Sequence, residues 1–541
     1  MRKKLNRYVL LFCFVLSVFL LPLITPVWEK IQAEKSDTTL VVGFDAEFPP
    51  YGYKDENGDY VGYDLDLAQE VCKRQGWTLV KQPIEWNSKD MELNSGTIDC
   101  IWNGFTVNGR EDEYTWTVPY VDNSQVIIVR NESDITELSH LENKIVAVQS
   151  DSSALAAFTG EGATEENLAL CASFKELQQI GDYNSAFMNL ESGMVDAIGM
   201  DIGVAKYQVE SRGETFRILE TRVSTEQYAV GFKLGNTKLR DQVQDTLKEM
   251  VEDGTFMKIS KKWDLEDCVC LGEQLGITEE STGEETESEA VLDNPKNEKE
   301  ENQDTNTPKG NKSDILPVVK QLGEGMVATL SIFFLTLVFA LPLGLLIAFA
   351  RMSRYRILNW ISGIYISIMR GTPLMLQLLV VFFGPYYFSQ YINRFLSEQY
   401  MITVNLSNSY RFLAVIIGFS LNYAAYFAEI YRAGIQGVPK GQREAALVLG
   451  YSRTQTFVKI IFPQMLKRIM PPVTNEVITL VKDTSLAFAL AYTEMFTLAK
   501  QISAAQTSIM PLFVAGVFYY VFNFIVAFVM KRIEKKMEYF Q

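Results

Sequence analysis

Histidine is almost absent from this chain of 541 residues, which has a single one, His140. The six cysteines, at positions 13, 72, 100, 171, 268 and 270, show no spacing typical of a zinc site. So few ligating and nucleophilic side chains speak against a zinc site and against Ser/His or Cys/His catalysis. We therefore predict no metal, no cofactor and no enzymatic centre. Whether Cys72 and Cys100 form a disulfide stays open.

Two further absences concern nucleotides and nucleic acids. No GxxxxGK[ST] motif occurs, so the chain cannot bind ATP in the manner of a P-loop protein. Acidic residues outnumber basic ones by 66 to 50, and the resulting net charge of −16 speaks against nucleic-acid binding.

The N-terminus begins with a basic heptapeptide, MRKKLNR, followed by an apolar run over 8–28. This order is typical of an export signal or of an N-terminal membrane anchor, since about twenty apolar residues can span a bilayer. Residues 31–33 form a poor cleavage site, which favours an anchor over a cleaved signal peptide in 1–35. In both cases we expect the next domain outside the cell.

Residues 36–270 have the pattern of an α/β domain with two lobes. Short β-rich runs alternate with helical patterns, and this alternation predicts largely parallel sheets. The expected strands are 39–44, 77–82, 98–103, 125–130, 144–149 and 196–201, and the expected helices are 64–76, 153–158, 183–193 and 237–254. In such domains ligands bind at the loops that follow the carboxyl ends of strands.

The stretch 271–314 is acidic and contains no aromatic residue. This composition predicts a disordered linker that tethers the first domain near the membrane. Residues 315–541 are instead dense in Leu, Ile, Val and Phe and predict an all-α membrane domain. Five spans are expected, at 326–350, 364–388, 411–430, 473–496 and 512–530.

Three basic clusters orient these spans. They are Arg351, Arg354 and Arg356; the loop 432–472; and Lys531, Arg532, Lys535 and Lys536. Lys and Arg accumulate on the cytoplasmic side, and five spans that start outside would put all three clusters inside. Ionisable residues in or near the spans are either functional or interfacial, and they are Glu429, Lys482 and Asp483.

The loop 432–472 contains a motif of the order E-A-A, glycine, then I-x-x-P. Its residues are Glu444, Ala445, Ala446, Gly450, Ile460 and Pro463. We expect a short helix over 444–450 capped by Gly450, and a second helix over 453–462 that stops at Pro463. The alternative is an ordinary amphipathic loop helix.

This motif resembles the coupling loop of bacterial ABC importer permeases, which binds a cytoplasmic ATPase subunit. RGTPLMLQ (370–377) and KDTSL (482–486) also resemble the permeases of the polar amino-acid family.

The domain 36–270 resembles the periplasmic-type binding proteins for polar amino acids (periplasmic binding protein-like II). The resemblance lies in VGFDAEFPPYGY (42–53), DYVGYDLDLAQEV (59–71), IWNGFTVNGRE (101–111) and ESGMVDAIGMD (191–201). It implies that Arg110, with Thr106 and the Gly104 backbone, holds the ligand's α-carboxylate, while Asp201 holds the α-ammonium. The substrate-binding residues implied in this way are Asp45, Phe48, Trp86, Asn103, Gly104, Thr106, Arg110, Ser152, Ser153 and Asp201.

Structural alternatives exist for several of these positions. Arg110 would otherwise be a surface cation paired with Glu111 or Asp112, and Asp201 a helix cap. Phe48 and Trp86, implied as walls around the ligand side chain, would otherwise be core residues. The spacing from Thr106 to Arg110 is one residue shorter than in the best-known members, a difference that Gly109 can absorb.

Acidic residues flank the expected aromatic walls, namely Asp45, Glu47 and Glu85. An acidic distal pocket disfavours Glu and Asp as ligands and favours basic amino acids or glutamine, with cystine as a close alternative. Trp86 would add cation–π attraction to a guanidinium group. Glu47 is expected to point to solvent.

Together these features predict a two-lobed α/β binding domain fused to a five-helix transmembrane permease of a type I importer. The protein would bind a polar L-amino acid outside the plasma membrane and pass it through its own permease, driven by a separate ATPase. Because an importer needs two membrane halves, a homodimer is expected. The alternatives are a ligand-gated channel or an amino-acid sensor with the same binding fold. An enzyme related to dehydratases would need Glu85 or Glu47 as acid/base residue.

Overall fold

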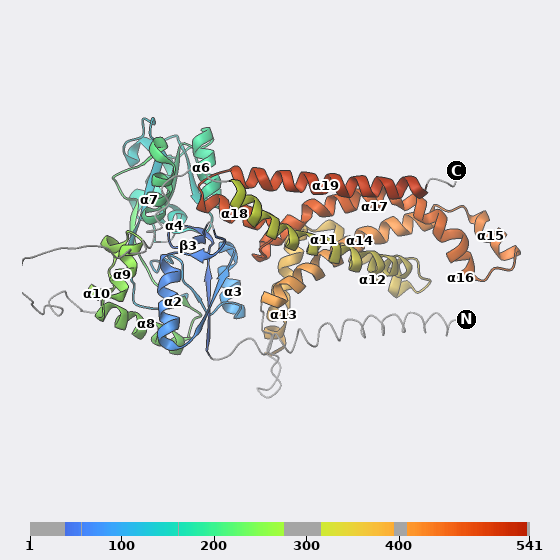
Figure 1. Ribbon diagram of the computed structural model, residues 1–541, viewed down its shortest axis with the longest axis horizontal. Coiled ribbons are helices and arrows are strands. Elements are labelled where there is room, and N and C mark those ends of the chain that lie inside the picture. Colours follow the sequence, from blue (N-terminus) through green and yellow to red (C-terminus); the bar gives the residue numbers. More distant parts are fainter. Residues whose placement is uncertain (1–37, 56, 161, 275–314, 394–407, 538–541) are drawn as a thin grey trace, which may run out of the picture.

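The structure is a computed structural model that describes residues 38–55, 57–160, 162–274, 315–393 and 408–537. An α/β part (38–274) lies at one end of a bundle of long helices (315–537), as Figure 1 shows. The expected anchor (1–35) and residues 275–314 of the expected linker lie outside the described residues.

The first lobe is built around β1 (Thr39–Phe44), an apolar strand buried in the core. β1 pairs in parallel with β5 (Thr78–Pro83) and β6 (Cys100–Ile101), and the sheet order is β5-β1-β6-β14-β7. Helix α2 (Tyr63–Gln75) packs against this sheet. It ends at Gly76, whose φ of 69° is the left-handed conformation that favours glycine.

The second lobe has the sheet order β10-β9-β11-β8-β12, with β13 paired to β8. Its centre is formed by β9 (Ile145–Gln149) and β11 (Ala197–Asp201), which are parallel. β8 (Val121–Arg130) is antiparallel to β11, β12 and β13, so the expectation of largely parallel sheets holds for only half of this lobe. The chain enters the lobe after β7 (Thr115–Trp116) and returns through β14 (Gly231–Phe232), so two crossovers link the lobes.

The remaining elements of the α/β part are short. The strands are β2 (Glu47–Phe48), β3 (Gly52–Lys54), β4 (Tyr60–Val61), β10 (Glu176–Ile180), β12 (Phe216–Ile218) and β13 (Ser224–Tyr228). The helices are α3 (Lys89–Ser95), α4 (Ser153–Thr159), α5 (Glu165–Ser173), α6 (Tyr183–Ser192), α7 (Ile202–Ser211), α8 (Thr237–Glu252), α9 (Thr255–Lys262) and α10 (Leu271–Gln274). The six expected strands and four expected helices are all present, although β6 is shorter than expected.

Two details of this part differ from the sequence-based expectations or close an open choice. Leu271 is 1% exposed and belongs to the hydrophobic core, so α10 extends the domain beyond residue 270 into the expected linker. Cys72 and Cys100 are both buried but remain free thiols, and no disulfide occurs among the described cysteines.

The helical part confirms an all-α domain. Its α-helices are α11 (Ile315–Arg351), α12 (Arg356–Gly371), α13 (Leu374–Asn393), α14 (Asn408–Gln436), α15 (Lys440–Val448), α16 (Arg453–Thr456), α17 (Phe462–Asp483), α18 (Met495–Ala505) and α19 (Met510–Met537). By length and composition, three described helices, α11, α14 and α19, can cross a membrane, or four if the bent pair α12–α13 is one span. The expected count of five continuous spans is therefore not reproduced.

The two spans that differ are interrupted. α12 and α13 are bent by 115° relative to each other, at Thr372 and Pro373. The residue before a proline disfavours the helical conformation, which explains the break. The expected span 473–496 ends as an α-helix at Asp483, continues as a 3-10 helix over Thr484–Leu490 and turns at Ala491, which has a left-handed φ of 47°.

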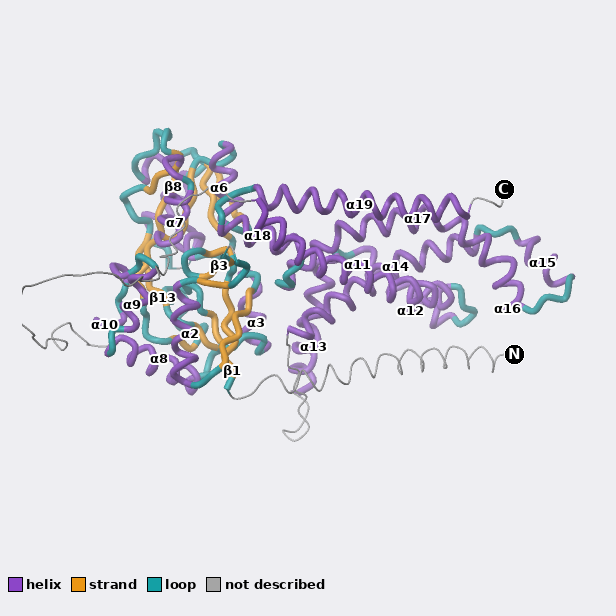
Figure 2. The backbone as a smooth tube through the Cα atoms, in the orientation of Figure 1, coloured by secondary structure: helices purple, strands orange, loops and turns teal. Residues whose placement is uncertain are grey.

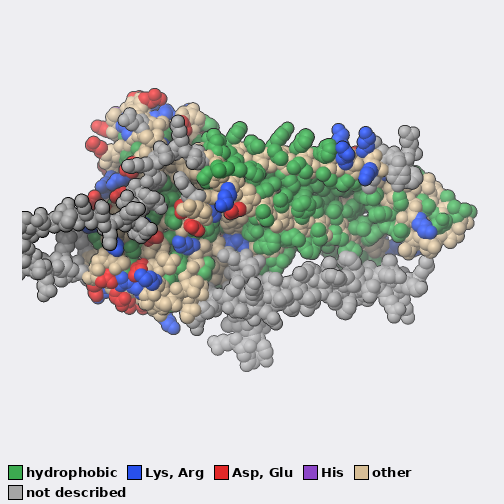
Figure 3. Space-filling view, viewed as in Figure 1, with side chains coloured by type: hydrophobic (Ala, Val, Ile, Leu, Met, Phe, Trp, Pro, Cys, Tyr) green, Lys and Arg blue, Asp and Glu red, His purple; other side chains and the backbone are tan. Residues whose placement is uncertain are grey.

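The α/β part and the loop 432–472 lie at opposite ends of the helical bundle (Figure 2). Hydrophobic side chains cover the visible face of the bundle between these ends, whereas charged side chains gather on the α/β part and near the far end (Figure 3). An apolar middle between polar ends is the pattern of a helical bundle that crosses a membrane.

Helix α18 joins the two parts by packing against β2, β3 and α6. A second contact is a buried ion pair, in which Arg411 Nη1 of α14 lies 2.9 Å from Glu92 Oε1 of α3. Both side chains are at most 2% exposed, so the pair is part of a closed interface.

Candidate functional site

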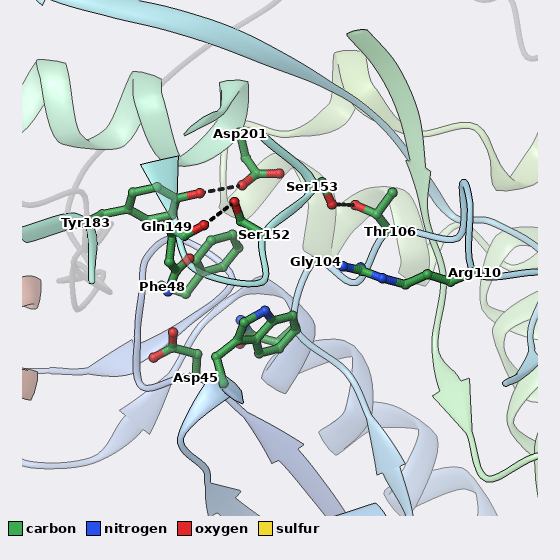
Figure 4. A pocket seen from close by; sticks show the side chains of 12 residues that line it. Asp45, Phe48, Gly104, Thr106, Arg110, Gln149, Ser152, Ser153, Tyr183 and Asp201 are labelled. Atoms are coloured by element: carbon green, nitrogen blue, oxygen red, sulfur yellow. Dashed lines mark hydrogen bonds between the residues drawn. The ribbon is translucent and has the colours of Figure 1, made fainter. Parts of the chain in front are cut away.

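A cavity lies between the two lobes and contains all ten substrate-binding residues expected from the sequence (Figure 4). The lining residues are Asp45, Phe48, Trp86, Asn103, Gly104, Thr106, Arg110, Gln149, Ser152, Ser153, Tyr183 and Asp201. Sequence reasoning missed Gln149 and Tyr183, although Gln149 ends an expected strand, and strand ends are where such sites form.

Asp201 forms one end of this cavity, at the carboxyl end of β11. Its Oδ1 accepts hydrogen bonds from Asn123 Nδ2 (2.8 Å), Gln125 Nε2 (2.7 Å) and the Tyr228 hydroxyl (2.6 Å). The hydroxyl of Tyr183 donates to Oδ2 at 3.2 Å. All four donors are neutral, so they orient the carboxylate without cancelling its charge.

The helix-cap alternative for Asp201 is wrong. The residue stands at the start of α7, but its side chain accepts no capping hydrogen bond from the helix. A second carboxyl group, Glu226, accepts from the same Asn123 and Gln125 amides, and burial together with repulsion from Asp201 raises its pKa to about 8. This end of the cavity is therefore a polar pocket of anionic character, suited to an ammonium group.

Arg110 reaches the cavity from the loop after Thr106. Gly109 has a φ of 78°, so the shorter spacing is absorbed by a conformation that favours glycine. The guanidinium lies 5.4 Å from the Phe105 ring, and its Nη2 is 3.5 Å from the carbonyl oxygen of Asp151. No ion pair with Glu111 or Asp112 forms, although the structure describes both residues, so the surface-pair alternative is not borne out.

Gly104 requires a correction. It lines the cavity, but its N–H donates to Asp64 Oδ2 at 2.6 Å and is not free to bind a carboxylate. Asp64 is fully buried and also accepts from the Tyr120 hydroxyl at 2.7 Å. A buried carboxylate needs such donors, and this need was not visible in the sequence.

The two serines at the start of α4 have different partners. Ser152 accepts from Leu155 N (3.2 Å) and donates to the Gln149 carbonyl (2.7 Å), so its hydroxyl caps the helix. Ser153 Oγ donates to Thr106 Oγ1 at 2.8 Å, a bond that crosses from one lobe to the other.

Further bonds hold the lobes together across the cleft. Trp86 Nε1 donates to the carbonyl oxygen of Asp151 at 3.3 Å, and Lys89 forms an ion pair with the Asp151 carboxylate. Lys89 is only 2% exposed although it is a lysine. The lobes therefore adopt a closed arrangement.

Phe48 and Trp86 both line the cavity and pack against other aromatic side chains. Phe48 is 7% exposed and packs against Tyr51 and Tyr183, with ring centroids 5.7 and 6.1 Å apart, yet it also lines the cavity. Trp86 stands edge-to-face on Phe105 at 5.5 Å and is partly exposed to the cavity.

The other end of the cavity is acidic. Burial raises the pKa of Asp45, whose Oδ1 accepts from the Glu47 backbone N–H at 2.8 Å. The expectation that Glu47 points to solvent is wrong, because its Oε1 lies 3.1 Å from Lys500 Nζ and its side chain is 12% exposed. Lys500 belongs to α18 of the helical part, and a partner so remote in the sequence could not be foreseen.

The motif in the loop 432–472 forms a protruding helical knob. Helix α15 is followed by Gly450, with a φ of 78°, and then by a capping box in which Ser452 and Gln455 bond each other's backbone. Glu444 and Ala445 are exposed, whereas Ala446 is buried. Three apolar side chains beside the motif are exposed, and they are Leu447, Val448 and Leu449.

The expected end of the second helix at Pro463 is wrong. A π-helical turn over Phe457–Ile461 follows α16, and α17 continues through Pro463 to Asp483. Proline lacks an N–H and clashes with the carbonyl four residues earlier, and the wider π turn just before it accommodates both effects. Among the ionisable residues near the spans, Glu429 pairs with Arg432 at 2.6 Å, and Asp483 accepts from the Tyr423 hydroxyl at 2.6 Å.

Comparisons with known proteins match both parts of the chain. Residues 40–266 match the family model of bacterial extracellular solute-binding proteins, family 3, and residues 340–539 match that of the binding-protein-dependent transport system inner membrane component.

Individual relatives match one part each. The arginine transport system permease protein ArtQ and the L-cystine transport system permease protein TcyB, both of Bacillus subtilis, are each 34% identical to this chain. These matches cover 42% and 40% of this chain and 96% and 86% of the respective relatives. Among solved structures, an ABC uptake transporter substrate-binding protein from Streptococcus pneumoniae with bound histidine is 31% identical, covering 45% of this chain and 97% of that chain with a TM-score of 0.41.

The two matched regions coincide with the two parts of the structure, and each carries the motif expected of it. The expectation of a transport component rather than an enzyme agrees with both families. The chain therefore belongs to the amino-acid ABC transporters and joins a solute-binding domain and an inner-membrane permease domain in one polypeptide.

Proposed function

We propose that this transporter imports a cationic amino acid, arginine or lysine, which its binding domain captures outside the cell. The observation that carries the proposal is that one cavity has a carboxylate at each end, Asp201 and Asp45, with the Arg110 guanidinium at its side. A cationic amino acid carries an ammonium and a carboxylate on its α-carbon and a second cation at the end of its side chain. In this cavity the α-ammonium would meet Asp201, the α-carboxylate Arg110 and the distal cation Asp45.

The other ligands considered fit less well. Glutamine would leave the acidic distal end without a counter-charge, and glutamate would meet repulsion there. Cystine would bring a second carboxylate toward Asp45 along with its second ammonium. Relatives of the permease domain carry names for arginine, cystine and glutamine transport, so the relatives by themselves leave the choice open.

A calorimetric titration of the soluble fragment 36–274 tests this proposal. The fragment includes α10, because Leu271 belongs to its core. We expect arginine and lysine to bind at least about tenfold more tightly than glutamine, and glutamate to give no measurable heat. Tighter binding of glutamine or cystine than of arginine would contradict the proposal.

The transport cycle also requires partners. A separate cytoplasmic ATPase would bind the knob formed by α15 and the following turns, where Leu447, Val448 and Leu449 offer exposed apolar side chains. Two copies of the chain would pair through their permease domains, and the binding domain would face the outside. Reconstitution with a candidate ATPase should give uptake that needs ATP and stops when the knob is deleted.

A ligand-gated channel has one feature in its favour, the bent pair α12–α13. However, only Thr372 and Pro373 separate these helices, and this is too short for a selectivity filter of the re-entrant kind. Solute flux through the purified chain without ATP and ATPase would support the channel instead.

A further inference from the structure

A second cavity, which we call the antechamber, lies between the two lobes and helix α18. It is lined by residues 45–47 and 83–87 of the first lobe, 181–182 of the second lobe and four permease residues within 491–501. Its empty space is about 470 Å³. Asp45 and Trp86 line both this cavity and the ligand cavity, so the two adjoin at the acidic end.

The antechamber collects four carboxyl groups and one ammonium group. The carboxyl groups are Asp45, Glu47, Glu85 and Asp182, and the single basic residue of the lining is Lys500. Lys500 Nζ lies 3.1 Å from Glu47 Oε1, and the two side chains are 20% and 12% exposed. One lysine therefore faces four carboxyl groups in a poorly hydrated space.

This environment raises the pKa values of the two glutamates in the cluster. Burial raises the pKa of Glu47 to about 8, with repulsion from Asp182, Asp45 and Glu85 acting in the same direction against the attraction of Lys500. Burial likewise raises the pKa of Glu85 to about 7. Such a cluster gains from any additional cation that enters it.

A metal ion is not the cation that this cluster suits. Within the part of the chain that the structure describes, no group of His, Cys, Asp or Glu side chains has an arrangement that could hold a metal ion. Two organic cations can reach the cluster, namely Lys500 and, under the proposed function, the side chain of a bound amino acid.

Helix α18 brings Lys500 to this place through its contacts with the binding domain. The hydroxyl of Tyr60 in the first lobe donates to Gln501 Oε1 at 3.2 Å, and that of Tyr207 in the second lobe donates to the Ala505 carbonyl at 3.2 Å. α18 thus contacts both lobes, and Lys500 stands between these anchors, facing the acidic end of the ligand cavity.

We propose that Lys500 is a release residue, whose ammonium competes with the cationic side chain of the bound ligand for the antechamber carboxylates. The inference rests on the proposed function, because only a cationic ligand has a distal charge to compete with. In an undocked domain the carboxylates attract the ligand. In the docked domain Lys500 offsets part of that charge, so the ligand is held less tightly at the boundary with the permease.

The test compares the full chain in nanodiscs, without ATPase, as wild type and as Lys500→Gln. Affinities for arginine and for glutamine are measured by calorimetry. We expect Lys500→Gln to bind arginine roughly tenfold more tightly than wild type, since one competing charge is gone, and to leave glutamine binding within about twofold. Lys500→Arg keeps the charge and should retain the wild-type affinity for arginine.

Gln501→Met is the matched control on the same helix, because it removes a docking hydrogen bond without a change of charge. It should affect arginine and glutamine equally. Unchanged arginine affinity in Lys500→Gln, or a parallel change for both ligands, would overturn the role of Lys500 and leave a docking contact only. If the wild-type chain binds neither arginine nor lysine, the proposed substrate class fails instead, so the two failures are distinguishable.

Discussion

The ligand cavity and the antechamber adjoin and are both acidic, yet they treat their carboxylates differently. In the ligand cavity Asp201 accepts hydrogen bonds from four neutral donors, including Asn123 and Gln125, and keeps its charge for a ligand. In the antechamber Glu47 is paired with a cation of the protein, Lys500. Neutral donors leave the charge of Asp201 for a ligand. A lysine of the permease domain offsets the charge of Glu47 when the two domains are in contact.

The comparison teaches where capture and release are separated. The groups proposed for capture all belong to the binding domain. The residue proposed for release, Lys500, belongs to α18 of the permease domain. The predictions below test this division, beginning with the largest expected effect.

The substitution Asp201→Asn should abolish capture. It preserves the shape of the side chain but removes the charge opposite the α-ammonium, which should weaken binding of every amino acid by roughly a hundredfold or more. Calorimetry on the fragment 36–274 measures this loss. Glu226→Gln is the control, since it keeps Asp201 and its donors and should change affinity far less. If Asp201→Asn kept full affinity, Asp201 would not be the group that binds the α-ammonium.

The substitution Asp45→Asn should affect specificity more than capture. Asp45 borders both cavities, and its charge is expected to act on a cationic side chain alone. Arginine binding should weaken by roughly tenfold, while glutamine binding should change by less than about threefold. The measurement is the ratio of the dissociation constants for arginine and glutamine. An unchanged ratio would mean that a group other than Asp45 binds the distal cation.

The pH dependence of this ratio in the full chain should be smaller. Burial raises the pKa of Glu85 to about 7, so a rise from pH 6 to pH 8 ionises it. An added negative charge attracts a cation, so binding of arginine is linked to proton release and should tighten about threefold, while glutamine binding lacks this component. Glu226, with a pKa of about 8, lies at the ammonium end and affects both ligands alike. Glu47, with a pKa of about 8, lies in the same antechamber and ionises in part over this range. Glu85→Gln should therefore reduce the pH dependence of the ratio, and Glu47 would supply the part that remains.

The smallest effect on amino-acid binding is expected at the far end of the molecule. A side chain at Gly450 would meet no atom within 4 Å, but its φ of 78° strains any L-residue by about 1–2 kcal/mol. Gly450→Ala should therefore leave amino-acid binding unchanged and lower ATP-driven uptake by about twofold to fivefold. Gly441→Ala, within α15 and equally open, is a control without this strain. Impaired binding in Gly450→Ala would mean that the two ends are coupled even without the ATPase.

Much of the binding domain could be predicted because its signals are local. Short β-rich runs identified β1, β9 and β11, and all ten expected site residues line one cavity. Positions such as Asp201 were assigned from the resemblance to polar amino-acid binding proteins, and their place at strand ends agrees with where ligands bind in such a fold. The signals of the knob are local as well, because Gly450 and the Ser452 capping box act within a few residues.

The predictions that were wrong concerned residues whose partners lie far away in the chain. The N–H of Gly104 is taken by Asp64, forty residues earlier, and Glu47 is paired with Lys500 of a different domain. The prediction of continuous spans was wrong for a related reason. Hydropathy predicts that 364–388 is apolar enough to span, but the turn at Thr372 and Pro373 decides its path.

By itself, the sequence determined the two domains, the strands and helices of the binding lobes and the coupling motif, because periodicity, turns and short motifs act over a few residues. The residues of the ligand cavity followed from the family resemblance that the sequence carries. Only the tertiary structure decided that Asp201 is surrounded by neutral donors and that α18 closes an acidic space with Lys500. Such contacts join residues hundreds of positions apart, as between Tyr60 and Gln501, which are 441 positions apart, and no local pattern encodes a partner at that distance.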